Sequence, residues 1–423
     1  MSTAPQPPES PQAEPAWWRR PPAAIAAAGI VGAIVLTLVL TAGRAGEDNA
    51  DTAGGTTSST TAASRAAGPE TTGGGAPSGS ATPSDATGPG AAGGTSGAAG
   101  GGITATTRPA GTAGGPGTIA FASRRFGAPG IFVVAGDGTG EKRLTPVQGE
   151  YFTPVWSPDG KRIAFASRRV DNTDVYVIDA DGSNEKRLTT HPGNDFDPAW
   201  SPDGRRIAFT RQPDAKPASD VYVVDAGGGG ERPLASTDDN EFGPVWSPDG
   251  GRIAYTRAGA GAAIWVVGPD GGRPRALVES AGHNLTPAWS PDGSRIAFVS
   301  NRNGNSDVFV ASADGSGVRA LTSDPGEDLA PAWSPDGRRL AYISARNADR
   351  DVRVVDGDGR NDRAVAANRS EEATPVWSPD GVRIAFVSDR DGLRQLYSVA
   401  ADGSGLRTLT VGGGPNFDPR WKP

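Results

Sequence analysis

The sequence predicts an all-β fold, a seven-bladed β-propeller of four-stranded blades with split-blade closure, preceded by one transmembrane helix and a disordered linker. Three observations lead to this prediction. The pentapeptide Trp-Ser-Pro-Asp-Gly recurs six times, and the steps between its tryptophans are 44, 46, 43, 44 and 44 residues. A repeat period of about 40–45 residues is typical of four-stranded propeller blades. Four short apolar stretches recur in each period, whereas the amino-terminal part of the chain has an unrelated composition.

The pentapeptide ends one predicted strand and turns the chain into the next. Proline presets φ, aspartate bonds to nearby backbone and glycine accepts a positive φ. The tryptophan is expected to pack between adjacent blades, with its indole N–H bonded to a partner. Because these residues recur in every blade, we interpret them as structural. The tryptophans are Trp156, Trp200, Trp246, Trp289, Trp333 and Trp377, and a further step of 44 residues reaches Trp421.

Residues 116–423 hold the repeats, and each unit has four strand-like stretches. Short β-branched and aromatic runs bounded by Gly, Asp, Pro or Asn are typical of strands. The region begins with a stretch of the second type at 118–123 and ends with one of the first type at 417–421. Pairing these two would complete a split blade, close the ring and remove its open edge.

The amino-terminal part predicts a membrane anchor. Residues 1–20 are rich in Pro and Glu and predict a disordered cytoplasmic tail. Residues 21–43 contain no charge, and the mostly apolar stretch within them spans roughly 30 Å as a helix, enough to cross a bilayer. Arg19 and Arg20 precede it, which favours a cytoplasmic amino terminus and an extracytoplasmic propeller. A cleaved signal peptide is the alternative, but the apolar run is longer than such peptides usually have.

Residues 44–115 are almost all Gly, Ala, Ser, Thr and Pro. No apolar periodicity survives there, so no core can form, and we expect a flexible linker with a reach of roughly 45 Å. The whole chain has a net charge of −7, which argues against a nucleic-acid partner. It has no cysteine and two histidines, and it lacks the GxSxG, HExxH and Walker motifs. We therefore predict no cofactor, no metal and no catalytic residues.

The positions five and six residues before each tryptophan vary from blade to blade. If the first strand is innermost, they ring one mouth of the central channel as an acidic and amide-rich funnel, which would concentrate oppositely charged ligands. Plain surface polarity is the alternative explanation. The candidate ligand-binding residues are Glu150, Tyr151, Asp195, Glu241, His283, Asn284, Glu327, Asp328, Glu371, Glu372 and Asn416.

Arginine follows each second stretch, and aspartate precedes several third stretches. We expect these to form Arg–Asp pairs that brace the loop inside a blade. The arginines are Arg124, Arg168, Arg211, Arg257, Arg302, Arg346 and Arg390, and the aspartates are Asp174, Asp220, Asp307 and Asp351.

The repeated pattern PxWSPDGxxIAFxSxR…DVYVxDADGSxxxRLT resembles the WD-like propeller repeat of TolB-type proteins over residues 117–423. This resemblance implies a β-propeller, commonly six-bladed, in the cell envelope, with protein partners around its channel. The chain departs from the pattern in its seven blades and in its predicted membrane helix. Similar repeats also cap prolyl oligopeptidase-like hydrolases, but no hydrolase domain accompanies them here.

The sequence thus predicts a membrane-tethered extracytoplasmic module that binds a protein, peptide or glycan of the cell envelope, with the lipid bilayer contacted through residues 21–43. A hydrolase or lyase that uses carboxylates at the channel mouth is the alternative. An envelope scaffold is a third hypothesis. A fold shared by many functions cannot decide among these ligands.

Overall fold

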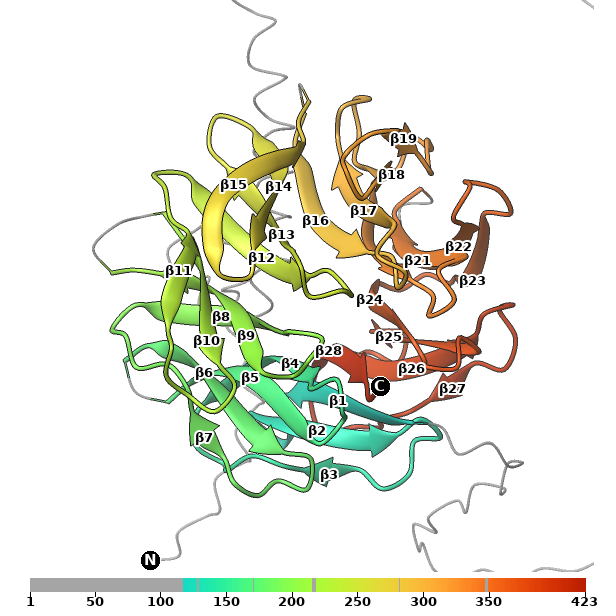
Figure 1. Ribbon diagram of the computed structural model, residues 1–423. Helices are drawn as coiled ribbons and strands as arrows, with labels where there is room; N and C mark the ends of the chain where they lie inside the picture. Colours follow the sequence, from blue (N-terminus) through green and yellow to red (C-terminus); the bar gives the residue numbers. More distant parts are fainter. Residues whose placement is uncertain (1–116, 128, 170, 215–217, 281, 347–348) are drawn as a thin grey trace, which may run out of the picture. The chain divides into compact units, whose positions relative to one another are not determined.

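The computed structural model describes residues 117–423, apart from residues 128, 170, 215–217, 281 and 347–348. In this region seven four-stranded antiparallel sheets are arranged about one axis (Figure 1), which confirms the predicted seven-bladed propeller. The tail 1–20, the predicted transmembrane helix 21–43 and the linker 44–115 lie outside the described residues. Within the described ranges, no helix has the length and apolarity needed to cross a membrane.

Blades two to seven are meanders in which each strand pairs with the next one along the chain, and in blade one the last strand of the chain pairs with the first. Blade one contains β28 (Asn416–Trp421), β1 (Thr118–Ser123), β2 (Gly130–Ala135) and β3 (Lys142–Arg143), with a short 3-10 helix at Arg125–Gly127. Blade two contains β4 (Glu150–Trp156), β5 (Arg162–Arg168), β6 (Thr173–Asp179) and β7 (Lys186–Arg187). Blade three contains β8 (Asn194–Trp200), β9 (Arg206–Gln212), β10 (Asp220–Asp225) and β11 (Arg232–Ala235).

The remaining four blades follow the same order. Blade four contains β12 (Asn240–Trp246), β13 (Ile253–Ala258), β14 (Ala262–Gly268) and β15 (Gly271–Val278). Blade five contains β16 (Asn284–Trp289), β17 (Arg295–Ser300), β18 (Asp307–Ser312) and β19 (Arg319–Ala320). Blade six contains β20 (Asp328–Trp333), β21 (Arg339–Ser344), β22 (Asp351–Asp356) and β23 (Arg363–Ala366). Blade seven contains β24 (Glu372–Trp377), β25 (Arg383–Ser388), β26 (Gln395–Ala400) and β27 (Arg407–Thr408).

Blade one joins the two ends of the repeat region, as predicted. β28 pairs antiparallel with β1, and the register sets Ile119 opposite Trp421 and Ser123 opposite Asn416. The backbone N–H of Lys422 also donates to the carbonyl of Thr118 at 2.7 Å. The last strand of the chain therefore serves as the first strand of the first blade, so the ring has no open sheet edge between its first and last blades.

The core lies between neighbouring blades. The second strands are buried almost along their whole length, as Ile163, Ala164 and Phe165 of β5 show with no exposed surface. Each core cluster combines side chains of two adjacent blades; one of them packs Ala164 of blade two against Trp200 of blade three. Each sheet therefore buries both faces, which explains why the second and third strands are almost wholly apolar.

The tryptophans join consecutive blades. Trp200 Nε1 donates to the carbonyl of Val155 in the preceding blade at 3.1 Å, and the guanidinium of Arg162 lies 4.8 Å from the Trp200 ring centre. Six of the seven tryptophans make the equivalent hydrogen bond to the preceding blade. Trp289 is the exception, since its Nε1 is buried and has no partner among the described residues. The predicted structural role of the tryptophan is confirmed.

Candidate functional site

The two ends of the propeller differ in chemistry. Because the strands alternate in direction, the turns after the first and third strands lie at one end, here called the turn end. The connections after the second and fourth strands lie at the other, here called the loop end. At the turn end the same bonds recur in blades two to seven; for example, Ser157 Oγ donates to Asp159 Oδ1 at 2.6 Å, and Gly160 has a φ of 64°. The pentapeptide thus builds the turns, and variation is confined largely to the loop end.

The residues five positions before each tryptophan, here called the junction residues, are buried. Six of them expose no surface at all, and Tyr151 exposes 3% of its surface. They lie at or near the start of the first strands at the loop end, but their side chains are buried in the propeller rather than exposed on its surface. Ligand binding by these residues stays a prediction. The junction residues are Tyr151, Asp195, Glu241, Asn284, Asp328, Glu372 and Asn416.

Each junction residue contacts an arginine of its own blade. Arg211 bonds both carboxylate oxygens of Asp195 at 2.7 and 2.8 Å, and Arg390 lies 3.0 Å from Glu372. The expected Arg–Asp brace also involves the first strand, since Arg211 bonds Asp195 there. In blades one and two the arginine is one position later than predicted, since Arg125 bonds Asn416 and Arg169 lies over the Tyr151 ring.

Burial raises the pKa values of the junction carboxyl groups, whereas nearby hydrogen-bond donors and arginines lower them. Removal from water raises the pKa of Asp195, and the bonds from Arg211 only partly offset this. Burial likewise raises the pKa of Glu241 and Glu372, against donors from Thr237 and from Ser388 respectively. Carboxylates held by internal donors in this way are suited to joining blades, and they offer no free group to a substrate.

The residues six positions before each tryptophan, here called the rim residues, are the more accessible set. Glu371 and Asn240 are exposed, whereas Glu150, His283 and Glu327 are half-buried. Arg124 lies 3.5 Å from Glu150, and Arg350 lies 3.6 Å from Glu371. The loops between second and third strands therefore bring arginines to the rim, which the sequence spacing did not indicate. The rim is consequently of mixed charge rather than uniformly acidic.

A second set of seven residues, not predicted from the sequence, occupies the position three residues before each tryptophan. All seven of its residues have positive φ, between 45° and 63°, at an irregularity in the pairing of the first strand. Side-chain oxygens of Thr153, Asp197, Thr286 and Thr374 are buried there and have no partner among the described residues. This axial ring consists of Thr153, Asp197, Gly243, Thr286, Ala330, Thr374 and Asp418.

Asp197 and Asp418 bring two carboxylates together in the axial ring, although blade two lies between their blades. Removal from water and then the nearby Asp418 raise the pKa of Asp197 to about 7, while Arg420 acts in the opposite direction. Burial also raises the pKa of Asp418. The first strands of adjacent blades contact one another, β28 with β4 and β4 with β8, so blade two is the only blade between these two carboxylates. Among the described residues, no group of three or more His, Asp or Glu could hold a metal ion.

Exposed large apolar side chains are few, and three of them belong to the loop end. Val411 exposes 81% of its surface, Val147 67% and Leu393 48%. Val411 lies in the loop that enters blade one, Val147 in the loop that enters blade two, and Leu393 in the loop between β25 and β26. Val382 and Leu406 are the corresponding exposed apolar residues in the turns of blade seven.

The repeats, the closed ring and the internal ion pairs define a β-propeller whose blades are built from a WD-like motif. The TolB beta propeller domain family, PD40, matches residues 115–267 and 262–423, which is most of the chain. The chain therefore belongs to the TolB-like PD40 β-propeller family. A search among curated proteins found no significant match.

Solved structures share the fold at low sequence identity. Oligogalacturonate lyase from Vibrio parahaemolyticus is 16% identical with a TM-score of 0.56, and the match covers 66% of this chain and 85% of that one. A puromycin-hydrolyzing peptidase from Mycobacterium tuberculosis is 16% identical with a TM-score of 0.54, covering 69% of this chain and 53% of that one. TolB from Acinetobacter baumannii is 21% identical with a TM-score of 0.49, covering 73% and 67%. The lyase and the peptidase have different activities, so the likeness establishes the propeller alone.

Proposed function

We propose that the chain is a membrane-tethered, extracytoplasmic β-propeller that binds a protein, peptide or glycan of the cell envelope at its loop end. Residues 21–43 anchor it to the cell membrane, with the amino terminus in the cytoplasm, and residues 44–115 serve as the tether. The observation that carries the proposal is the contrast between the two ends of the propeller. One end repeats the Trp-Ser-Pro-Asp-Gly turn in six of the seven blades, whereas the other presents a different loop in each.

The loop end has the composition of a recognition surface. Val147, Leu393 and Val411 supply exposed apolar area, and burying one such side chain contributes about 1.5–3 kcal/mol. The rim residues Glu150 and Glu371, with their neighbouring arginines, supply polar contacts of both signs. Protein interfaces commonly combine buried apolar contacts with hydrogen bonds and charged contacts. The alternative of a hydrolase or lyase receives no such support, since the junction carboxylates are buried.

Binding at the loop end can be tested with paired variants at the two ends. We expect V147D/V411D to reduce capture of a partner from envelope extract by about tenfold or more, because two apolar contacts would be replaced by charges. The matched control, V382D/L406D, carries the same type of change at the turn end and should retain wild-type capture. Capture is measured by quantitative mass spectrometry and sugar analysis of material held by the immobilised chain.

The outcomes separate the possibilities. Equal loss in both double variants would show that the loop end is not the binding surface. If the wild-type chain retained no protein, peptide or sugar, the binding function itself would be refuted.

The proposed topology predicts a separate result. Protease added to intact cells should cleave within residues 44–115 and release a fragment that contains the propeller, because that segment would lie outside the cytoplasm. The measurement is an immunoblot for the carboxyl-terminal region in cells and supernatant, with a cytoplasmic protein as the control for lysis. Protection of the carboxyl-terminal region in intact cells, together with cleavage after lysis, would contradict the orientation.

A further inference from the structure

Neighbouring blades are joined by buried polar pairs, and in the pair between blades two and three each carboxylate is bonded by an arginine. Asp174 at the start of β6 lies beside the junction residue Asp195, with the hydroxyl of Thr189 donating to Asp174 at 3.5 Å. Arg187 lies 2.7 Å from Asp174, and Arg211 bonds Asp195 at 2.7 and 2.8 Å. Arg211 also bonds Glu231 at 2.6 Å, yet it keeps both bonds to Asp195.

The equivalent pair between blades seven and one consists of two amides, and the guanidinium of Arg125 donates to both of them at 3.2 and 3.3 Å. Asn416 Nδ2 donates to Gln395 Oε1 at 3.0 Å, and the hydroxyl of Thr410 donates to the same oxygen at 2.9 Å. Thr410 occupies the place that Thr189 has between blades two and three, since each accepts a bond from a backbone N–H of the third strand. This site therefore needs a hydrogen-bond donor on one side chain and an acceptor on the other.

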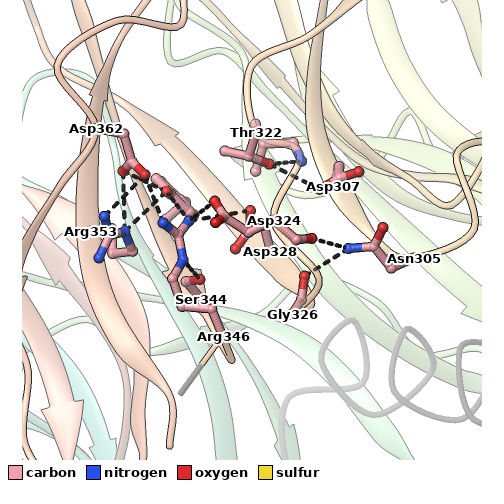
Figure 2. A network of polar contacts seen from close by, with 12 residues as sticks. Asn305, Asp307, Thr322, Asp324, Gly326, Asp328, Ser344, Arg346, Arg353 and Asp362 are labelled. Atoms are coloured by element: carbon pink, nitrogen blue, oxygen red, sulfur yellow. Dashed lines mark hydrogen bonds and ion pairs between the residues drawn. The ribbon is translucent and has the colours of Figure 1, made fainter. Parts of the chain in front are cut away.

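The pair between blades five and six has two carboxylates, neither of which is hydrogen-bonded by an arginine of the described ranges. Asp307 exposes 1% of its surface and Asp328 none, and Figure 2 shows Asp307 next to Thr322 and Asp328 next to Asp324. Thr322 Oγ1 donates to Asp307 at 3.4 Å. Ala320 stands where Arg187 stands in blade two, because each is paired with the equivalent aromatic residue of the third strand.

Arg346, the counterpart of Arg211, is present but binds other carboxylates more closely than it binds Asp328. Arg346 lies 3.7 Å from Asp328, whereas it lies 2.7 Å from Asp324 and 2.9 Å from Asp362. Arg353, which replaces the usual aromatic residue of the third strand, also binds Asp362 at 3.0 Å (Figure 2). The guanidinium of Arg346 is thereby engaged by Asp324 and Asp362, and both carboxylate oxygens of Asp328 are buried without a hydrogen-bond partner among the described residues.

We propose that Asp307 and Asp328 share one proton, so that a carboxylic acid and a carboxylate form the same donor–acceptor pair as Asn416 and Gln395, and that loss of this proton weakens the junction between blades five and six. Two adjacent carboxylates removed from water cannot both ionise at low cost. The proton supplies the donor that the Asn416 amide supplies between blades seven and one. When it leaves, it passes to solvent, and the junction is left with two negative charges.

The charged groups around the pair agree with this assignment. Burial and then the neighbouring Asp328 raise the pKa of Asp307 to about 7, and Asp324 acts in the same direction. Burial raises the pKa of Asp328 as well, against the charge of Arg346. Because the folded pKa of Asp307 exceeds the ordinary value of 3.8, the folded state binds the extra proton. The stabilisation is complete below the ordinary value and is lost as the pH rises through about 7.

The test is the pH dependence of thermal unfolding of the full chain and of D307N/D328N, whose two amides reproduce the neutral pair between blades seven and one. We expect the double variant to unfold a few degrees above the wild type at pH 8, roughly 2–4 °C for each kcal/mol gained. The difference should vanish near pH 5, where the wild-type pair holds its proton. The difference in unfolding temperature between the single variant D307N and the wild type should likewise grow between pH 5 and pH 8.

A matched control is D174N, at the pair between blades two and three. It removes the partner of Arg187, so it should unfold below the wild type at pH 8, the opposite sign to D307N. Should the amide variants not fold, the infrared absorbance of protonated carboxyl groups in the wild type must fall between pH 5 and pH 9, and it must fall by less in D307A and D328A, where only other carboxyl groups such as Asp197 contribute. A difference between D307N/D328N and wild type that is constant with pH would overturn the proposal. So would stabilisation of the wild type, but not of D307N, by Mg²⁺ or Ca²⁺ at pH 8, since a cation would then replace the proton.

Discussion

Removal of residues 416–423 should abolish the cooperative unfolding of the propeller and convert the monomer into aggregates. The truncation deletes β28, so β1 becomes an open edge with unpaired backbone groups along Thr118–Ser123. It also removes Trp421, which is 8% exposed and whose Nε1 donates to Val376 of blade seven at 3.2 Å. The loss of one buried tryptophan alone costs about 3–5 kcal/mol, a large part of the stability of a domain.

Two smaller changes separate the contribution of the Trp421 side chain from that of the β28 backbone. The variant W421A keeps the backbone of β28 and should remain monomeric, with a loss of about 3–5 kcal/mol in unfolding free energy. Deletion of residue 423 alone leaves every pairing of β28 in place and should behave as the intact chain. Light scattering and thermal unfolding followed by circular dichroism measure both properties. A truncated 1–415 chain that stayed monomeric and unfolded with the wild-type midpoint would contradict the role of β28 in closure.

Replacement of Arg211 by alanine should destabilise the protein by about 3–5 kcal/mol, because it leaves buried carboxylates without their cation. Arg211 is 2% exposed and bonds Asp195, which has no exposed surface, as well as Glu231 at 2.6 Å. The loss should be greatest above neutral pH and smaller near pH 5. In the variant, Asp195 has no close guanidinium, so its pKa rises further and the folded state gains stability by taking up a proton as the pH falls.

Two controls keep the interpretation specific. R211K retains a positive charge but not the two parallel bonds to Asp195, so it should lie between R211A and the wild type. R360A removes an exposed arginine 3.8 Å from Asp358, and it should change the unfolding free energy by less than about 0.5 kcal/mol. Chemical unfolding at pH 5 and pH 8 supplies the comparison. An R211A loss no larger than that of R360A would show that the buried ion pair contributes nothing to blade packing.

The regular period of Trp-Ser-Pro-Asp-Gly was sufficient to predict the propeller, its seven blades and the closure through residues 417–421. These features follow from local chemistry that repeats: a proline and a glycine that make a turn, alternating runs that make strands, and a tryptophan large enough to join two sheets. Each repeat has the same local sequence pattern, so its strands and turns can be predicted without knowledge of distant contacts. The proposed membrane segment 21–43 rests on a similarly local property, an uncharged apolar run of sufficient length.

Only the tertiary structure decided which polar residues are buried and what each one contacts. Position in the repeat placed Asp195, Asp328 and Glu371 alike near one end of the propeller, yet Asp195 and Asp328 are fully buried whereas Glu371 is exposed. The axial pair Asp197 and Asp418 was invisible in the sequence because its members lie 221 positions apart and meet only when the ring closes. Strand patterns encode local conformation, whereas burial, ionisation and charge balance depend on neighbours from other blades, and those neighbours are brought together only by the closed fold.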